Sequence, residues 1–350
     1  MKHFRLSYAV TLACLILAGA WGFQHGGASA ALSAMGVALI LGIMEVSLSF
    51  DNAVVNASVL RGWDAFWQRL FLGVGILIAV FGMRLLFPLV IVAAAASLSI
   101  PEVWAMALHH PAEYAAHLSS HHAEVAAFGG VFLLLVFLNF LMDEDKELHW
   151  LGNVERKLGS FGKVGAVPIL IALAMVLLSS RLAGAQGADV LVAGIWGILT
   201  YVGVDVLGNV LEKEEETDVD VGQLVKRGGI SAFIYLEVLD ASFSFDGVIG
   251  AFAITTDIVV IMLGLAIGAM FVRSMTVFLV RQGTLDEFVY LEHGAHYAIG
   301  MLALIMFASM KYHIPEIVTG LVGIAFIGAS LWGSIRHKRG ALASSAELVS

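Results

Sequence analysis

One short motif occurs twice in this sequence, as Ile43-Met-Glu-Val-Ser-Leu-Ser-Phe-Asp-Asn52 and again as Leu239-Asp-Ala-Ser-Phe-Ser-Phe-Asp-Gly247. Aligned without a gap, the two copies carry acids, serines and a phenylalanine at the same positions. Such a match is difficult to obtain by chance in a chain that is only 13% charged, so we interpret it as an internal duplication. The matched pairs are Glu45 with Asp240, Ser47 with Ser242, Ser49 with Ser244, Phe50 with Phe245, Asp51 with Asp246, and Asn52 with Gly247.

A second pair of residues follows each copy. Gly75 is followed by Arg84 nine residues later, and Gly264 is followed by Arg273 at the same spacing. Both arginines lie within apolar stretches, so they are the natural candidates to balance the charge of the motif acids.

The composition predicts a membrane protein. Apolar residues make up 59% of the 350 residues, and the mean hydropathy is +0.90, which is more apolar surface than a soluble core of this size buries. The single cysteine, Cys14, excludes a disulfide framework and a thiolate metal site. The net charge of −9 and the lack of a basic stripe argue against nucleic acid as a partner.

Ten apolar segments are each close to the length that a bilayer core requires. Their apolar runs are continuous, which is typical of helices and not of barrel strands, so the expected fold is an all-α, polytopic bundle. The first segment has two interpretations that stay open, an uncleaved anchor span or a signal peptide. The expected spans are 7–23, 31–60, 70–96, 124–142, 164–180, 188–210, 229–254, 257–280, 292–310 and 316–335.

Lysine and arginine predict the orientation. With the N-terminus inside, only Arg181 and Lys311 fall on the outer side of the membrane. Both termini are therefore expected on the cytoplasmic side of a bacterial inner membrane. The two motif copies then run in opposite directions, which is an inverted repeat. The expected parts are an N-terminal anchor or signal peptide (1–30), a first repeat (31–210) with a histidine-rich outer loop (97–124), an acidic linker (211–228), a second repeat (229–335) and a tail (336–350).

Inverted repeats are the usual plan of secondary transporters, whose sites are formed by discontinuous helices near the midplane. A carboxylate at mid-membrane costs about 3 kcal/mol or more unless it is paired, protonated or bound to a cation. On an ideal helix Asp51 lies about 120° away from Glu45. We therefore expect both motif helices to unwind, so that their acids converge. The alternative is a set of structural ion pairs with Arg84 and Arg273. Carboxylate and amide oxygens suit hard divalent cations.

The motifs also carry a family resemblance. Glu45-Val-Ser-Leu-Ser-Phe-Asp51-Asn52 resembles the first signature of the TerC family of integral membrane proteins, and Glu237-Val-Leu-Asp240-Ala-Ser-Phe-Ser-Phe-Asp246 resembles the second. The resemblance covers about residues 31 to 330 and implies an exporter of metal ions, chiefly Mn²⁺, related to tellurium-resistance proteins. Gly247, where a serine is usual, and the histidine-rich loop depart from the pattern. The implied ion ligands are Glu45, Asp51, Asn52, Glu237, Asp240 and Asp246.

Two histidine groups are accessory candidates. On one helix, His117, His121 and His122 would present a pair four residues apart that can hold a transition metal, whereas the alternative is a solvated loop. Glu292, His293 and His296 open the ninth span and suggest a proton relay or an inner metal site, or else interfacial residues beside lipid headgroups.

The expected function is therefore export of a divalent cation, Mn²⁺ first and Ca²⁺ or Mg²⁺ next, in exchange for protons. The cation is a substrate, and no permanently bound cofactor is expected. The competing hypothesis is a non-transporting scaffold or metallation partner in a metal or tellurite stress-response complex, which would bind an exported metalloprotein or form an oligomer. We do not expect an enzyme, because no Ser/Lys or His-Glu-x-x-His arrangement stands out.

Overall fold

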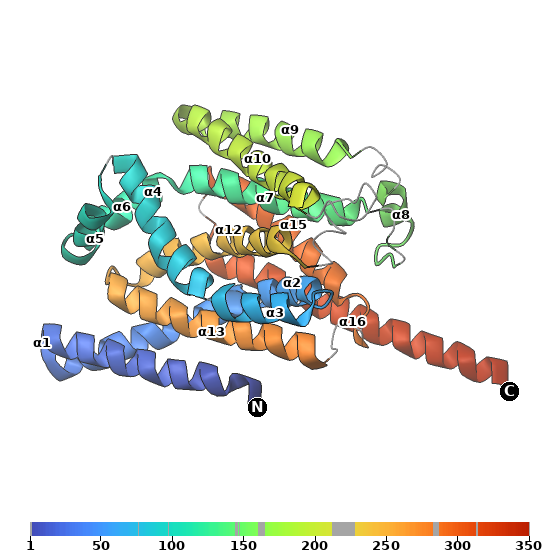
Figure 1. Cartoon of the computed structure of the whole chain (residues 1–350), viewed down its shortest axis with the longest axis horizontal. Helices are drawn as coiled ribbons and strands as arrows, with labels where there is room; N and C mark the ends of the chain where they lie inside the picture. Colours follow the sequence, from blue (N-terminus) through green and yellow to red (C-terminus); the bar gives the residue numbers. More distant parts are fainter. Residues whose placement is uncertain are drawn as a thin grey trace.

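The structure is a computed structural model that describes residues 2–75, 77–96, 98–143, 146, 148–159, 165–211, 228–282, 287–312 and 314–349. Every regular element in these residues is a helix (Figure 1). The expected all-α class is therefore confirmed. Most of the predicted acidic linker, residues 212–227, lies outside the described residues.

The first long helix, α1 (Arg5–Leu48), follows the short η1 (Lys2–Phe4) and doubles back on itself. Its reversal lies at Gly26 and Gly27, and Gly27 has a φ of 70°, which favours glycine. The two arms then touch, since a Cβ on Gly22 would lie 2.5 Å from the carbonyl oxygen of Ala30. The helix α1 therefore consists of two antiparallel arms, which run along α13 (Figure 1).

The next segments connect the first motif to an outer hairpin. The chain continues through α2 (Phe50–Leu60), α3 (Ala65–Leu70), the π-helical η2 (Phe71–Gly75) and η3 (Ile78–Leu86), and α4 (Phe87–Ala96). Asp64 starts α3 by accepting hydrogen bonds from the backbone N–H groups of Phe66 and Trp67. The hairpin consists of α5 (Ile100–His109) and α6 (Pro111–Ser120).

The centre of the bundle is α7 (His122–Leu141), which packs against α10 (Gly187–Leu211) and α15 (Leu291–Ser309). Small residues allow these close approaches, as where Gly197 meets the backbone of Phe128 and Gly300 meets the ring of Phe137. In Figure 1, α9 and α10 form the upper layer and α1 and α13 form the lower layer. The remaining elements are α8 (Asn153–Gly159), α9 (Val167–Leu182), η4 (Gly184–Gln186), α12 (Ile230–Ile254), α13 (Ile258–Gln282) and α16 (Glu316–Val349).

Six helices in the described part of the chain are long and apolar enough to cross a membrane: Arg5–Leu48, His122–Leu141, Gly184–Val204, Ile258–Gln282, Leu291–Ser309 and Ile317–Arg339. The sequence predicts ten spans, and this number stays a prediction. Four features account for the difference. The first helix contains two predicted spans folded back on each other, the predicted span 70–96 is divided among several elements, α9 is an apolar helix of only 16 residues, and α12 carries three acids.

The expectation that both motif helices unwind is wrong for the second copy. The helix α12 is continuous through Ser244–Gly247, whereas α1 and α2 are separated only at Ser49, whose φ and ψ are −101° and 18°. A helix break requires partners for the freed backbone groups. Such partners occur beyond the motif, where Asp257 accepts hydrogen bonds from Val259 and Val260 and so begins α13.

Candidate ion site

The two motif copies meet through a side-chain hydrogen bond. The amide Nδ2 of Asn52, in α2, donates to Oδ1 of Asp240, in α12, over 2.6 Å. Both side chains are buried, with exposed fractions of 1% and 6%. Polar groups from opposite halves of the sequence therefore share one buried region, as the duplication predicts.

The acid of the first copy is neutralised. Oε1 of Glu45 lies 2.5 Å from Nη2 of Arg84, and the same oxygen accepts a hydrogen bond from Ser49 Oγ over 2.9 Å. Nη1 of Arg84 donates to the carbonyl of Ala79, five residues earlier in η3. Both charged groups are buried. At this position the structure has the ion pair that the sequence left open as an alternative to an ion ligand.

The acids of the second copy differ, because several of their oxygens lack partners. Both carboxylate oxygens of Glu237 and Oδ2 of Asp240 are buried without a hydrogen-bond partner in the described part of the chain. The same is true of Oδ1 of Asn52 and Oδ1 of Asn56. A buried polar group without a partner is costly, so such a cluster of acceptors indicates a place for a cation or a proton.

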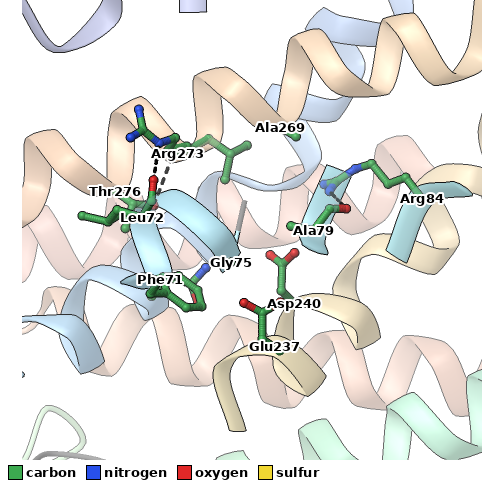
Figure 2. A pocket seen from close by; sticks show the side chains of 12 residues that line it. Phe71, Leu72, Gly75, Ala79, Arg84, Glu237, Asp240, Ala269, Arg273 and Thr276 are labelled. Atoms are coloured by element: carbon green, nitrogen blue, oxygen red, sulfur yellow. Dashed lines mark hydrogen bonds between the residues drawn. The ribbon is translucent and has the colours of Figure 1, made fainter. Parts of the chain in front are cut away.

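A cavity of about 40 Å³ lies against these acids. Its lining includes Asn56, Gly75, Glu237 and Asp240 from both halves of the sequence. Figure 2 shows the Glu237 and Asp240 carboxylates directed from α12 toward the segment that holds Gly75 and Ala79. One water molecule requires about 10–15 Å³ by the same kind of measure, so the space is large enough for a small ion or for water.

Gly75 permits this arrangement. A Cβ at position 75 would lie 2.5 Å from Oε1 of Glu237, closer than any real contact. The glycine singled out in the sequence as part of the repeat is therefore needed for the close approach of η2 to a carboxylate.

Two of the six predicted ligands are elsewhere or undescribed. Asp51 is buried, but a Cβ on Gly323 would lie 3.1 Å from its Oδ2, which places this carboxylate against α16. The side chain of Asp246 lies outside the described residues. Among the described residues, no three His, Cys, Asp or Glu side chains are arranged to hold a metal. Of the six predicted ligands, Glu237 and Asp240 line the cavity and Asn52 donates to Asp240 beside it, while Asn56 is an additional lining residue. The ligand set as a whole stays a prediction.

Helix geometry accounts for part of this set. On the continuous α12, Glu237 and Asp240 are three residues apart and share a face. Asn56 was missed at the sequence level, although it follows Asn52 by four residues on the same face of α2.

The two arginines have different environments. Arg273, in α13, donates from Nε to the carbonyl of Leu72 over 2.7 Å, whereas Arg84 pairs with a carboxylate. Both arginines line the cavity beside Asp240. Both arginines were expected to balance the charge of an acid. Among the described contacts, Arg84 pairs with a carboxylate and Arg273 does not.

The outer-loop histidines do not form the expected cluster. The helix α6 ends at Ser120 and α7 begins at His122, so His117 and His121 are not four apart on one helix. Nδ1 of His121 lies 2.8 Å from Oε1 of Glu124, and Nε2 of His122 lies 3.1 Å from Oγ of Ser309. The metal site expected there is wrong in its geometry.

The histidines of α15 are held in packing contacts. Nε2 of His293 lies 2.9 Å from the Leu148 carbonyl, and the ring of His296 stacks on Phe140 with centroids 3.9 Å apart. Glu292 lies 3.7 Å from Arg61 on the surface. These contacts account for the three residues structurally, and their role as a proton relay stays a prediction.

A buried acid near these histidines was missed by sequence reasoning. Glu155, in α8, is fully buried and lies 2.5 Å from Nζ of Lys146. Burial alone raises the pKa of Glu155, but hydrogen bonds from Lys146 and from the Leu151 N–H outweigh burial and hold this pKa below its usual value. In the sequence Glu155 lies between two expected spans and gave no signal, because its burial depends on tertiary packing.

Comparisons with known proteins give the family. A family model described as "Protein of unknown function (DUF475)" matches residues 50–341, and the chain belongs to this family. The "Uncharacterized membrane protein YceF" of Bacillus subtilis (strain 168) is 33% identical over 126 residues, which are 34% of this chain and 48% of that relative. The match thus spans about half of the relative's length. No solved structure matches the chain.

These comparisons and the apolar helices identify an integral membrane protein in contact with the lipid bilayer. The family found is DUF475, so the resemblance to TerC proteins, with its implications of manganese and tellurium resistance, contributes only to the proposal that follows.

Proposed function

We propose that this DUF475 membrane protein is a secondary transporter that exports a divalent cation across the bacterial inner membrane, with Mn²⁺ preferred and Ca²⁺ or Mg²⁺ next. The observation that carries the proposal is a set of buried oxygens that have no hydrogen-bond partner among the described residues. They belong to Glu237, Asp240 and Asn56, which line one cavity, and to Asn52, which donates to Asp240. Carboxylate and amide oxygens are the ligands that hard divalent cations prefer.

Energetics support a bound charge at this place. An intramembrane acid costs about 3 kcal/mol or more unless it is paired, protonated or bound to a cation. Arg84 is already engaged by Glu45, so Glu237 is left to a proton or a cation. If a proton and the cation replace each other on the same carboxylates, cation export is coupled to proton entry. The direction of transport and the preference for Mn²⁺ come from the resemblance to TerC proteins.

The proposal includes an inverted repeat of ten spans with both termini in the cytoplasm. Contacts between the two halves support the inverted repeat. The helix α1, which carries the first acid, packs along α13, which carries the second arginine, and α12 packs against η3, which carries the first arginine. Gly75 meets Glu237, and Gly264 meets Gly42, which is the residue matched to Glu237 in the repeat. Sites between such repeats are typical of secondary transporters.

The test is cation flux in proteoliposomes with Mn²⁺, Ca²⁺ and Mg²⁺ compared under an imposed pH gradient. We expect Mn²⁺ flux that falls to background in Glu237→Gln and in Asp240→Asn, since each removes a ligand charge and little volume. The matched control is Glu287→Gln, an exposed acid whose pairing with Lys338 contributes little. Wild-type protein that moves none of the three cations would overturn the proposal and favour the scaffold or metallation partner.

A further inference from the structure

The two repeats contain an acid and an arginine at matched positions, but the acid and the arginine are paired in the first repeat and not in the second. In the repeat alignment Glu45 corresponds to Asp240, and Arg84 corresponds to Arg273. We propose that Arg273 is the counter-ion of Asp240 in a second conformation, in which Arg84 releases Glu45. This inference rests on the proposed transport function and assigns the two arginines as alternating partners of the two halves.

The first pair is closed in this structure. Arg84 contacts the Glu45 carboxylate through Nη2 and the Ala79 carbonyl through Nη1, while its Nε is buried without a partner. One donor of the guanidinium is thus unused, although acceptors of Asp240 and Glu237 are present at the same cavity.

The second pair is open. Arg273 donates to the Leu72 carbonyl, and Figure 2 shows its side chain directed away from Asp240. Oδ2 of Asp240 is buried and has no hydrogen-bond partner among the described residues, yet Asp240 and Arg273 line the same cavity. The ion pair that the repeat predicts at this position is therefore unmade, while its counterpart in the first half is made.

The surroundings of the two pairs match at one position and differ at another. Gly268 faces the side chain of Glu45, and Ala79, which lies at the matched position of the first half, lines the cavity with Asp240. In contrast, Asn52 donates to Asp240, whereas the matched Gly247 faces the Glu45 carboxylate. A small residue of the arginine-bearing helix thus lies beside each acid, and the amide holds only Asp240.

Alternation has a physical purpose. A buried carboxylate that loses its cation needs a replacement charge, because an uncompensated buried charge is strongly destabilising. An arginine that closes one half while the other half is open supplies this charge and prevents both halves from opening together. Arg84 lies in the π-helical η3, where looser hydrogen bonding permits a change of register.

The experiment measures side-specific labelling without any cation. In a Cys14→Ala background, a single cysteine at Thr276, which lines the cavity, is treated with a membrane-impermeant thiol reagent from either side of sealed vesicles. Arg84→Gln weakens the closed pair and Arg273→Gln weakens the pair of the second conformation. We expect the ratio of labelling from the two sides to move in opposite directions, by about tenfold.

Matched variants separate exchange from a folding defect. Glu45→Gln should shift the ratio in the same direction as Arg84→Gln, and Asp240→Asn should act like Arg273→Gln, because each breaks the same pair from its other side. Arg84→Lys and Arg273→Lys keep the charges and should shift the ratio less. The proposed exchange of arginine partners would be overturned if the labelling ratios of all variants shifted in the same direction. It would also be overturned if the ratios did not change in variants that remain monodisperse.

The transport assay distinguishes this inference from the proposed function. Opposite shifts together with no flux of Mn²⁺, Ca²⁺ or Mg²⁺ would support the exchange and overturn the cation substrate. Normal Mn²⁺ flux together with unchanged labelling ratios would overturn the exchange and leave the proposed function standing.

Discussion

The two copies of the motif differ in how their polar groups are satisfied. In the first copy Glu45 contacts both Arg84 and Ser49, next to a one-residue interruption of the helix. In the second copy Glu237 lies on a continuous helix, and its carboxylate oxygens are without partners. Duplicated segments therefore need not keep one role. The first half has an ion pair, and the second half has carboxylate oxygens without hydrogen-bond partners among the described residues.

The largest effect is expected from Arg84→Met. It leaves Glu45 buried without its partner, so we expect a loss of about 3–5 kcal/mol in stability. Arg273→Met, at the matched position, removes one bond to a carbonyl and should cost about 0.5–1.5 kcal/mol. Thermal unfolding in detergent measures both. The double variant Glu45→Gln, Arg84→Met should recover most of the loss, and equal costs for the two arginines would break the comparison.

A smaller effect is expected at the amide that joins the copies. Asn52→Ala leaves Oδ1 of Asp240 without its donor, which should cost about 1–3 kcal/mol of stability. Asn56→Ala is the matched variant, because the Asn56 oxygen has no partner to lose among the described residues. We expect Asn56→Ala to be nearly neutral in thermal unfolding and to weaken Mn²⁺ binding measured by calorimetry. Comparable destabilisation by both would contradict a ligand role for Asn56.

Gly75→Ala tests the second copy without altering any charge. The added methyl group would displace the Glu237 carboxylate, so we expect Mn²⁺ flux to fall by about tenfold, equivalent to about 1.4 kcal/mol. Gly73→Ala is the control, because a Cβ there meets nothing within 4 Å. Flux in proteoliposomes is the measurement, and equal flux in the two variants would remove Gly75 from the site.

The smallest effect distinguishes the two matched serines. Ser49→Ala removes a hydrogen bond to Glu45 and should lower stability by about 1 kcal/mol. Ser244→Ala should be neutral or slightly stabilising, because the Ser244 hydroxyl is buried without a partner among the described residues. Unfolding temperatures of the two variants, compared in one detergent, provide the check. A larger loss of stability in Ser244→Ala than in Ser49→Ala would contradict the assignment of hydrogen bonds to the two serines.

Much of the site was accessible from the sequence. The repeat singled out Asp240, Asn52 and Gly75, and the resemblance to TerC proteins added Glu237. Glu237, Asp240 and Gly75 line the cavity, and Asn52 donates to Asp240. Glu45 and Arg84 were also singled out, and the structural ion pair left open as an alternative is present. Repetition and intramembrane charge are visible in residue order alone, whereas the role of these residues as ion ligands stays a prediction.

Other features required the folded chain. The residue order did not show that α12 stays regular through Ser244–Gly247, or that a helix ends at Ser120 and so separates His117 from His121. Glu155 is buried in contact with nearby Lys146 and with His293 of α15, which is distant in sequence.

The sequence by itself determined that this protein is helical, lies in a membrane and repeats an acidic motif, because hydropathy, charge and repetition are properties of local chain segments. Tertiary structure decided that Glu45 pairs with Arg84 while the Glu237 oxygens are without partners. The reason is physical. The partner of a buried charge depends on the rotation and spacing of neighbouring helices, and these follow from packing across the whole bundle.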